Sequence, residues 1–172
     1  MKSLKKRREP DATVVCIDQT RASVQVEPRK AWFPKGSRPA VELSGQRDWT
    51  CVLGAITEDG DAFFSQTEEY ITAQHAKHFI LALQGEFQEE LIVVLDGAPY
   101  FQASTVTELA DQEPISFVRL PAYTPELNPV EECWQQLKTS LGNRLFTSLR
   151  DLKRAINASL TQLSLPNMSN YF

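Results

Sequence analysis

The sequence predicts an α/β domain built on a mixed β-sheet with helices packed on its faces. Two features predict this class. Strand-like segments near the start of the chain are joined by a hairpin turn, which indicates antiparallel neighbours, and the second half alternates strand-like with helix-like segments, which indicates right-handed crossovers between parallel strands. A chain of 172 residues has the size of one domain and buries a core without disulfides or bound metals to stabilise it.

Four short segments in the first half have the composition of β-strands. They are residues 13–17, 21–26, 48–57 and 61–65. The first is a β-branched apolar run that ends directly in Asp18, an acid whose burial is costly unless it has a use. The last two flank Asp59-Gly60, and an Asp-Gly pair between strand-like segments is a hairpin signal, so these strands should be antiparallel.

Strands and helices alternate in the second half. Helices are predicted over residues 72–86 and 104–110, from about Asn128, and from Thr147 or Ser148; strands are predicted over residues 91–95 and 115–120. Thr72 can cap the first of these helices. Its apolar stripe consists of Ala76, Phe79, Ile80 and Leu83. Because His75 and His78 lie off that stripe, surface positions are expected for both rather than a metal site.

Residues 120–138 (LPAYTPELNPVEECWQQLK) join the last strand to a helix through a proline-rich loop. Pro129 suits the first position of a helix, Asn128 can cap it, and Glu131 follows three residues after that cap. The predicted buried stripe contains Val130, Cys133, Trp134, Leu137 and Leu141. Glu131 lies on the flank of this stripe, whereas Glu132 points into solvent. Taken alone, Glu131 is typical of a capping box, so its use as a ligand depends on other carboxylates.

The charge distribution separates a basic N-terminus from an acidic body. The net charge is −4, but five of the 18 basic residues lie in the first eight positions, which leaves 13 basic against 22 acidic residues and a balance of −9 from residue 9 onward. Residues 1–12 are therefore expected to form a basic, flexible arm. Phosphate binding normally shows as an excess of Lys and Arg. The acidic body therefore either binds DNA weakly by itself, or concentrates a few basic residues locally and carries its acids for another purpose such as holding metal.

Hydropathy and cysteine usage bound the class of protein further. The longest aliphatic run, residues 91–95, is far too short to span a membrane, and no apolar stretch follows the basic N-terminus, so a soluble cytoplasmic protein is expected. Cys16, Cys51 and Cys133 are scattered without a C-x-x-C pair. This pattern favours buried free thiols over zinc ligands or disulfides.

Acids follow two of the predicted buried strands, Asp18 after residues 13–17 and Asp96 after residues 91–95. In an open α/β sheet, ligands collect at the carboxyl ends of the central strands. Two carboxylates brought together there repel each other unless a cation intervenes. Mg²⁺ or Mn²⁺ takes oxygen ligands and keeps waters that phosphate oxygens can displace, and a pair of such ions supports in-line phosphoryl transfer without a histidine base.

The acids and the sequences around them resemble the DDE transposase and integrase superfamily, in particular the mariner-like insertion-sequence transposases of prokaryotes. The matching motifs are Asp18 in VVCIDQT, Asp96 in VVLDGAP and Glu131 in LPAYTPELNPVEECWQQLK, with 34 residues between the last two acids. The loop AWFPKGSRP and the segment WTCVLGAITEDG are also similar to that family, and several ordered motifs together are a specific signal. The resemblance covers nearly all of residues 13–163, the expected catalytic domain, and leaves residues 164–172 as a C-terminal tail.

The resemblance implies a ribonuclease H-like fold, an α/β mixed sheet of about five strands with helices on both faces, and cut-and-paste DNA transposition with two Mg²⁺ or Mn²⁺ ions. Water first attacks a phosphodiester at the end of the mobile element, and the freed 3′-hydroxyl then attacks target DNA. Asp18 and Asp96 are expected to share the metals, and Glu131 to complete one coordination shell. Supporting roles in positioning this helix or anchoring it in the core are expected of Pro125, Asn128, Pro129 and Trp134. Weaker candidates for phosphate contacts are Lys35, Arg38 and Lys138.

The implied partners are DNA, both element ends and target, and a second copy of the chain in a homodimeric active complex. Members of the family usually carry N-terminal helix-turn-helix modules that recognise the element's ends, and this chain begins a dozen residues before its first predicted strand. Recognition of the element's ends would then come from a separately encoded helix-turn-helix half as a further partner, from a frameshifted fusion product, or not at all. The expected location is the cytoplasm, with association to the nucleoid when DNA is bound.

The sequence departs from the family pattern near two of the acids. The family commonly has Asn and His near the second acid, where this chain has Gly97 and Tyr100, and Gln19 replaces a common Glu after the first. None of these changes removes a metal ligand. Two other hypotheses stay open: a metal-dependent nuclease of the ribonuclease H or resolvase kind, and a non-catalytic, truncated transposase remnant.

Overall fold

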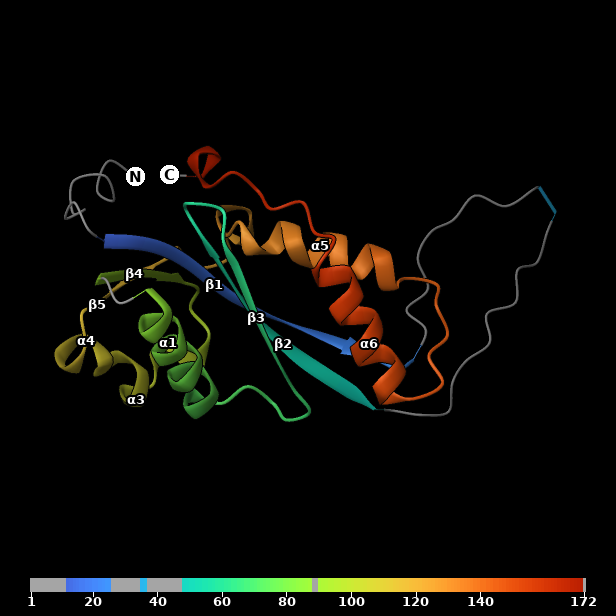
Figure 1. Ribbon diagram of the computed structural model, residues 1–172, viewed down its shortest axis with the longest axis horizontal. Helices are drawn as coiled ribbons and strands as arrows, with labels where there is room; N and C mark the ends of the chain where they lie inside the picture. Colours follow the sequence, from blue (N-terminus) through green and yellow to red (C-terminus); the bar gives the residue numbers. More distant parts are fainter. Residues whose placement is uncertain (1–11, 26–34, 37–47, 88–89, 172) are drawn as a thin grey trace.

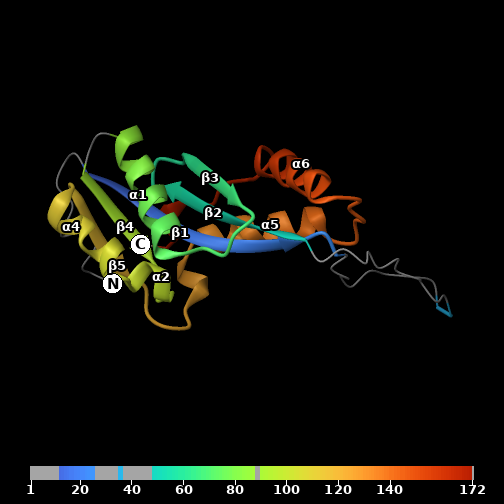
Figure 2. The ribbon, with the colours of Figure 1, turned by 90° about the horizontal axis from the view of Figure 1, so that it is seen from below.

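The computed structural model describes residues 12–25, 35–36, 48–87 and 90–171, which form a five-stranded sheet with helices on both faces (Figures 1 and 2). The strands are β1 (Ala12–Ser23), β2 (Trp49–Thr57), β3 (Ala62–Thr67), β4 (Glu90–Leu95) and β5 (Ile115–Arg119). The helices are α1 (Ala73–Phe87), α2 (Pro99–Gln102), α3 (Ser104–Thr107), α4 (Leu109–Gln112), α5 (Val130–Leu141) and α6 (Leu149–Leu160), with short 3-10 turns η1 (Pro125–Leu127) and η2 (Met168–Asn170). None of these helices has both the length and the apolar composition needed to cross a membrane. The predicted α/β class and strand number are confirmed.

The sheet has the strand order β3-β2-β1-β4-β5. β2 pairs antiparallel with β3, as the hairpin signal predicted, and also with β1, whereas β4 lies parallel to both β1 and β5. In the β1–β4 pair, Cys16 lies opposite Val94. Continuing this register by two residues brings Asp18 next to Asp96, so the topology places two acids from distant parts of the sequence side by side.

β1 corrects one prediction, because the expected strands 13–17 and 21–26 are a single strand. β2 pairs with β1 along its length, from Val15 opposite Thr57 to Ser23 opposite Trp49. No glycine or proline interrupts this stretch to form a turn, so the partner strand keeps it extended; residue 26 lies outside the described residues. Asp18 therefore lies within a strand rather than at its end.

The connection between β4 and β5 also differs from the prediction of one helix over residues 104–110. It consists of the three four-residue helices α2, α3 and α4, and the extended residue Ala103 separates the first two. Each short helix buries one apolar side chain in turn, Phe101, Val106 and Leu109. The irregular spacing of these three anchors does not match one continuous helix, so their packing decides the backbone path.

Alternate residues of the central strands face two separate cores. On one face Val15, Ile17 and Val93 pack beneath α1 and the short helices. On the other face Cys16 and Val94 pack against α5 and α6, and Figure 1 shows these two helices crossing the sheet away from α1. Ala76, Phe79, Ile80 and Leu83 of α1 and Val130, Cys133, Trp134 and Leu137 of α5 are buried as predicted, whereas Leu141, the last residue of the predicted α5 stripe, is only partly buried against the same core. The three cysteines are buried free thiols, as expected.

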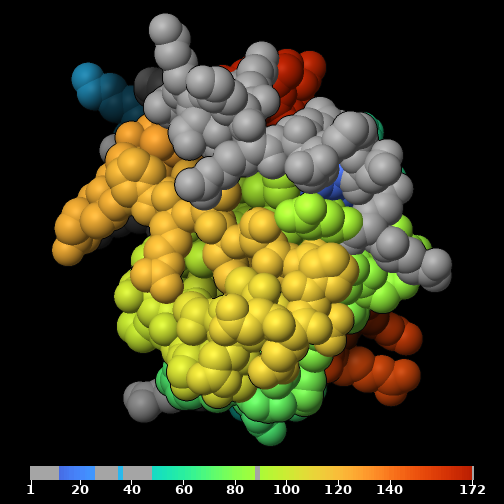
Figure 3. All heavy atoms as spheres, turned by 90° about the vertical axis from the view of Figure 1, so that its left-hand side faces the viewer, coloured from blue at the N-terminus to red at the C-terminus, as the bar shows by residue number. Residues whose placement is uncertain are grey.

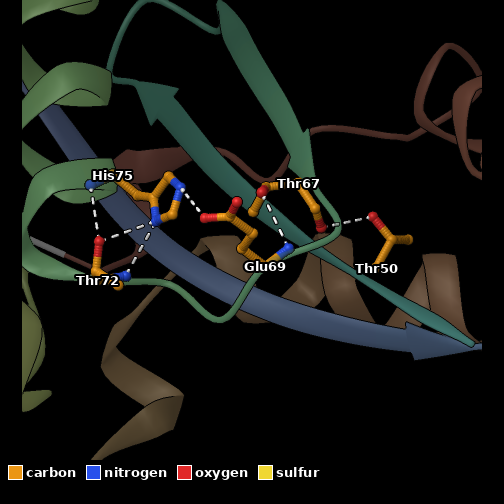
Figure 4. Close-up of polar contacts among 5 residues, drawn as sticks. All are labelled: Thr50, Thr67, Glu69, Thr72 and His75. Atoms are coloured by element: carbon orange, nitrogen blue, oxygen red, sulfur yellow. Dashed lines mark hydrogen bonds and ion pairs between the residues drawn. The ribbon is translucent and has the colours of Figure 1, made fainter.

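His75, one of the two histidines, forms hydrogen bonds with Thr72 at the start of α1 (Figure 4). Thr72 Oγ1 accepts a hydrogen bond from the backbone N–H of His75, and the Nδ1 atom of His75 accepts one from the backbone N–H of Thr72, both at 3.3 Å. This reciprocal pattern is that of a capping box, with histidine in the place of the usual glutamate. The Nε2 atom of His75 lies 3.5 Å from Glu69, while His78 is exposed. The expectation of surface roles fits these positions.

Residues 164–171, beyond the expected catalytic domain, pack along α5. The side chain of Gln136 donates a hydrogen bond to the carbonyl of Ser164 and accepts one from its N–H. Met168 is buried in the core shared by α5 and α6, and the hydroxyl of Tyr171 contacts the carboxylate of Glu132. These contacts tie the end of the described chain to the helix that carries Glu131.

Candidate functional site

A cleft of about 400 Å³ opens where the ends of β4 and β5 meet β1 and the start of α5. Its walls carry all three predicted acids, Asp18 from β1, Asp96 after β4 and Glu131 in the first turn of α5. The loop of residues 120–125 forms the remaining rim, together with Gly97 and Asn128. Among the described residues that line the cleft, none is Lys, Arg or His, so the site is strongly acidic.

Asp18 is held at the base of this site and is only 6% exposed. Its Oδ2 atom accepts a hydrogen bond of 3.0 Å from the indole N–H of Trp134. The pKa of Asp18 is raised to about 7: burial is the largest cause and the carboxylates of Glu131 and Asp96 add to it, while the backbone N–H of Gln19 and the Trp134 indole act in the opposite direction. In the absence of a cation, the fold disfavours the charged form of this carboxyl group.

Gly54 makes room for the indole that reaches Asp18. It lies directly opposite Asp18 in the β1–β2 register, and a Cβ atom at this position would lie 2.5 Å from Cη2 and 2.8 Å from Cζ2 of Trp134. Phe64 borders the same indole edge-on, with 6.0 Å between the ring centroids. Trp134 was predicted to anchor the helix in the core, but neither Gly54 nor the hydrogen bond to Asp18 was predicted. A glycine inside a strand pattern is a signal of close approach and would have pointed to this contact.

Asp96 directly follows β4 and is half-buried. Its Oδ1 atom accepts a hydrogen bond of 3.0 Å from the backbone N–H of Ala98, which forms the tight turn that leads from the strand into α2. This contact orients the carboxyl group at the carboxyl end of a central strand, the position predicted from the sequence.

Asn128 ties the start of α5 to β1. Its side-chain amide donates a hydrogen bond to the carbonyl of Ile17, and its Oδ1 atom accepts one from the N–H of Val130, both at 3.2 Å. The backbone N–H of Asn128 donates to the carbonyl of Pro125 at 2.9 Å, so it does not serve a capping box with Glu131. Because Ile17 directly precedes Asp18, the bond from Asn128 fixes the first turn of α5 next to Asp18.

Of the other predicted site residues, only some lie at or near the cleft. Pro125 lines the cleft and Pro129 is buried beneath the start of α5. Lys138 lies two turns along α5 from Glu131 and does not line the cleft. Lys35 is exposed, and Arg38 lies outside the described residues. Tyr100, one of the departures from the family pattern, lies close to the acids: burial raises its pKa, and the charges of Asp96 and Asp18 raise it further.

The donor set of the cleft fits a hard divalent metal. Within the part of the chain that the structure describes, no three acid, histidine or cysteine side chains lie close enough together to form a preformed metal cage. The three carboxylates nevertheless share one cleft, and a cation between them would offset the repulsion that acts on Asp18. Oxygen donors without nitrogen or sulfur suit Mg²⁺ or Mn²⁺, with water and phosphate oxygens completing the coordination.

Comparisons with known proteins agree with this geometry. The sequence profile of a family described as DDE superfamily endonuclease matches residues 13–153, and a search of the curated proteins found no match. The fold is similar to the Mos1 mariner paired end complex with Mn (TM-score 0.73, 16% identity, covering 91% of this chain and 50% of that chain). It is also similar to the Mos1 Strand Transfer Complex (TM-score 0.68, 15% identity, 88% and 48%) and to the catalytic domain of Mos1 mariner transposase (TM-score 0.64, 15% identity, 88% and 71%).

The structural likeness at these identities establishes the fold, which is ribonuclease H-like as predicted. The chain spans about half the length of the Mos1 chains in the paired end complex and in the strand transfer complex, 50% and 48%. The matched family profile extends over most of the chain and includes Asp18, Asp96 and Glu131. The chain therefore belongs to the DDE superfamily of endonucleases.

Proposed function

We propose that this chain is the catalytic domain of a cut-and-paste DNA transposase, in which Asp18, Asp96 and Glu131 hold two Mg²⁺ or Mn²⁺ ions. The observation that carries the proposal is the convergence of these acids, from three separate elements, on one cleft. Structures of Mos1 with Mn, with Mg and in a strand transfer complex support it, because that transposase has the same fold.

The residues of the chain supply geometry rather than a general base. Bound divalent ions would stabilise the attacking and leaving oxygens of an in-line phosphoryl transfer. The Trp134 indole orients Asp18, the Ala98 N–H orients Asp96, and Asn128 sets the position of the turn that carries Glu131. The carboxyl groups of Asp18 and Asp96 are thereby each held by a contact of their own, and Glu131 is placed by the fixed start of α5. This limits the reorganisation needed when metal and DNA bind.

The proposed partners are DNA and a second copy of the chain. Element ends and target DNA are the substrates, and the active complex is a homodimer in the cytoplasm, associated with the nucleoid. Because the body of the chain is acidic and the described cleft lining has no cationic side chain, recognition of the element ends is assigned to a separately encoded helix-turn-helix half. Phosphate contacts by Lys35, Arg38 and Lys138 belong to the same proposal.

Cleavage and joining of DNA by the purified chain test the catalytic assignment. With Mn²⁺ present, we expect nicking of supercoiled plasmid and joining of an oligonucleotide 3′-hydroxyl to it, and we expect Asp96→Asn to abolish both. Asp111→Asn, an exposed acid on α4, is the matched control and should change neither. Cleavage that persists in Asp96→Asn would refute the role of these acids, and nicking without joining would favour the nuclease hypothesis.

Metal binding without DNA gives a second test. Paramagnetic broadening of NMR signals by Mn²⁺ should centre on Asp18, Asp96 and Glu131 and should disappear in Asp18→Asn. A folded chain that shows neither localised broadening nor DNA cleavage would be a non-catalytic remnant, and the proposal would be wrong.

A further inference from the structure

Tyr123 is the most exposed large hydrophobic side chain of the described residues, and it lies at the rim of the acidic cleft. Its exposed fraction is 100%, and it lines the same cleft as Asp18, Asp96 and Glu131. Figure 2 shows the loop between β5 and α5 standing clear of the body of the domain, and Figure 3 shows it as the orange projection beside the yellow surface of α2 to α4 and β5. The ring therefore faces solvent where a substrate would enter.

The backbone at this position adopts a conformation that disfavours tyrosine. Its φ angle is +62°, in the left-handed region that residues other than Gly, Asn and Asp rarely adopt. Glycine would adopt it without strain. A side chain that makes no buried contact does not compensate for this cost within the fold. Because the ring has no packing role within the fold, we interpret the strained position as one that serves contact with a ligand.

The loop holds Tyr123 in place from both ends. At its start, the N–H of Leu120 donates to the carbonyl of Leu95 at 2.9 Å, which fixes it to β4. Within the loop, the Thr124 hydroxyl donates to the carbonyl of Pro121 at 2.8 Å, and at its end Asn128 binds β1. The exposed position is therefore built into the fold, and the ring is presented to a ligand at a small entropic cost.

The composition of the cleft indicates which ligand. Its described lining has no cationic side chain and one aromatic ring, that of Tyr123. An aromatic ring binds the face of a nucleobase without needing a charge, and it does so with little regard to sequence. Resting on the proposed function, we propose that Tyr123 stacks on an unpaired base next to the scissile phosphate of the DNA. A base inside an intact duplex is already stacked on both faces, so the contact favours frayed or single-stranded ends.

Fluorescent DNA tests this contact directly. The probe is a short duplex with a single-stranded 3′ extension that carries 2-aminopurine at the junction, mixed with the full chain and Mn²⁺ and read before cleavage. We expect Tyr123→Ala to weaken binding about tenfold and to lose the quenching of 2-aminopurine, with the melting temperature unchanged. Tyr123→Phe keeps the ring and should behave as the wild type. Tyr70→Ala is the matched control, because Tyr70 is 65% exposed and lies outside the cleft.

The outcomes separate this inference from the proposed function. If Tyr123→Ala keeps the affinity and quenching of the wild type while Asp96→Asn abolishes cleavage, the stacking contact is wrong and the function stands. If the wild type neither quenches the probe nor cleaves DNA, both are wrong. A change in oligomeric state of Tyr123→Ala in light scattering, with quenching unchanged, would place the ring at a protein interface and overturn the inference. If Tyr123→Ala lost the same binding affinity for fully paired DNA as for DNA with a single-stranded extension, the preference for an unpaired base would be contradicted.

Discussion

Replacing Asp18 with asparagine should stabilise the metal-free protein while removing metal binding. The pKa of Asp18 is raised from an ordinary value of 3.8 to about 7 in the folded state, so the folded chain holds this proton more tightly than the unfolded chain does. Stability from this group is therefore fully present below about pH 4 and is lost as the pH rises towards 7. At about 1.4 kcal/mol for each pH unit, the gap corresponds to about 4 kcal/mol. Asparagine stays neutral, and its Oδ1 atom can still accept the Trp134 hydrogen bond.

Urea unfolding with EDTA measures this difference at two pH values. At about pH 4 the wild type and Asp18→Asn should have nearly equal unfolding free energies, and at about pH 8 the variant should be more stable by about 4 kcal/mol. Mn²⁺ should then stabilise the wild type and leave the variant unchanged. The control is Asp59→Asn in the β2–β3 turn, where Asn-Gly also suits the hairpin. Equal stability of wild type and Asp18→Asn at the higher pH would refute the argument.

Three further substitutions test how the acids are held. Trp134→Phe keeps the packed ring but loses the N–H donor, so it should lower the unfolding free energy by about 1–2 kcal/mol and weaken the localised Mn²⁺ broadening in NMR spectra. Gly54→Ala forces a Cβ atom against the Trp134 indole and should cost about 1–3 kcal/mol in urea unfolding; in contrast Gly85→Ala, a helix position with nothing within 4 Å of a new Cβ, should be stabilising. Asn128→Ala removes the bonds to Ile17 and to the start of α5, so we expect about 1–3 kcal/mol of destabilisation and slower plasmid nicking. Unchanged nicking and unchanged stability in Asn128→Ala would show that this tie does not set the site.

The fold was predictable where one physical signal acted alone. The Asp-Gly pair at Asp59 required a tight turn, and the structure has a hairpin there with Gly60 at φ +92°. The stripe of α5 followed from helical spacing, and its residues up to Leu137 are buried. The acids were found because their spacing and surrounding motifs resembled a family, and the parallel β1–β4 register then brought Asp18 and Asp96 together.

The errors arose where tertiary contacts override local patterns. β1 continues through Gln19 and Thr20 because β2 pairs with it throughout, a contact that the local sequence does not contain. Asn128 accepts a hydrogen bond from the start of α5, as its predicted capping role implies, but its side-chain bond to the carbonyl of Ile17 in β1 was not predictable from the local sequence. The Trp134–Asp18 bond joins residues 116 positions apart, and only the folded sheet brings them together.

Burial raises the pKa of Asp18, and the carboxylates of Glu131 and Asp96, which add to this effect, also make the cleft acidic. Without metal, three carboxylates line a cleft that has no described cationic side chain, so the site opposes both the charge of Asp18 and the approach of DNA phosphates. With the proposed pair of divalent ions, four positive charges exceed the three negative ones, and the same cleft attracts phosphate. On this proposal, DNA affinity at the cleft depends on metal binding. A contact that needs no charge, such as the ring of Tyr123, complements this dependence because it acts equally before and after the metals bind.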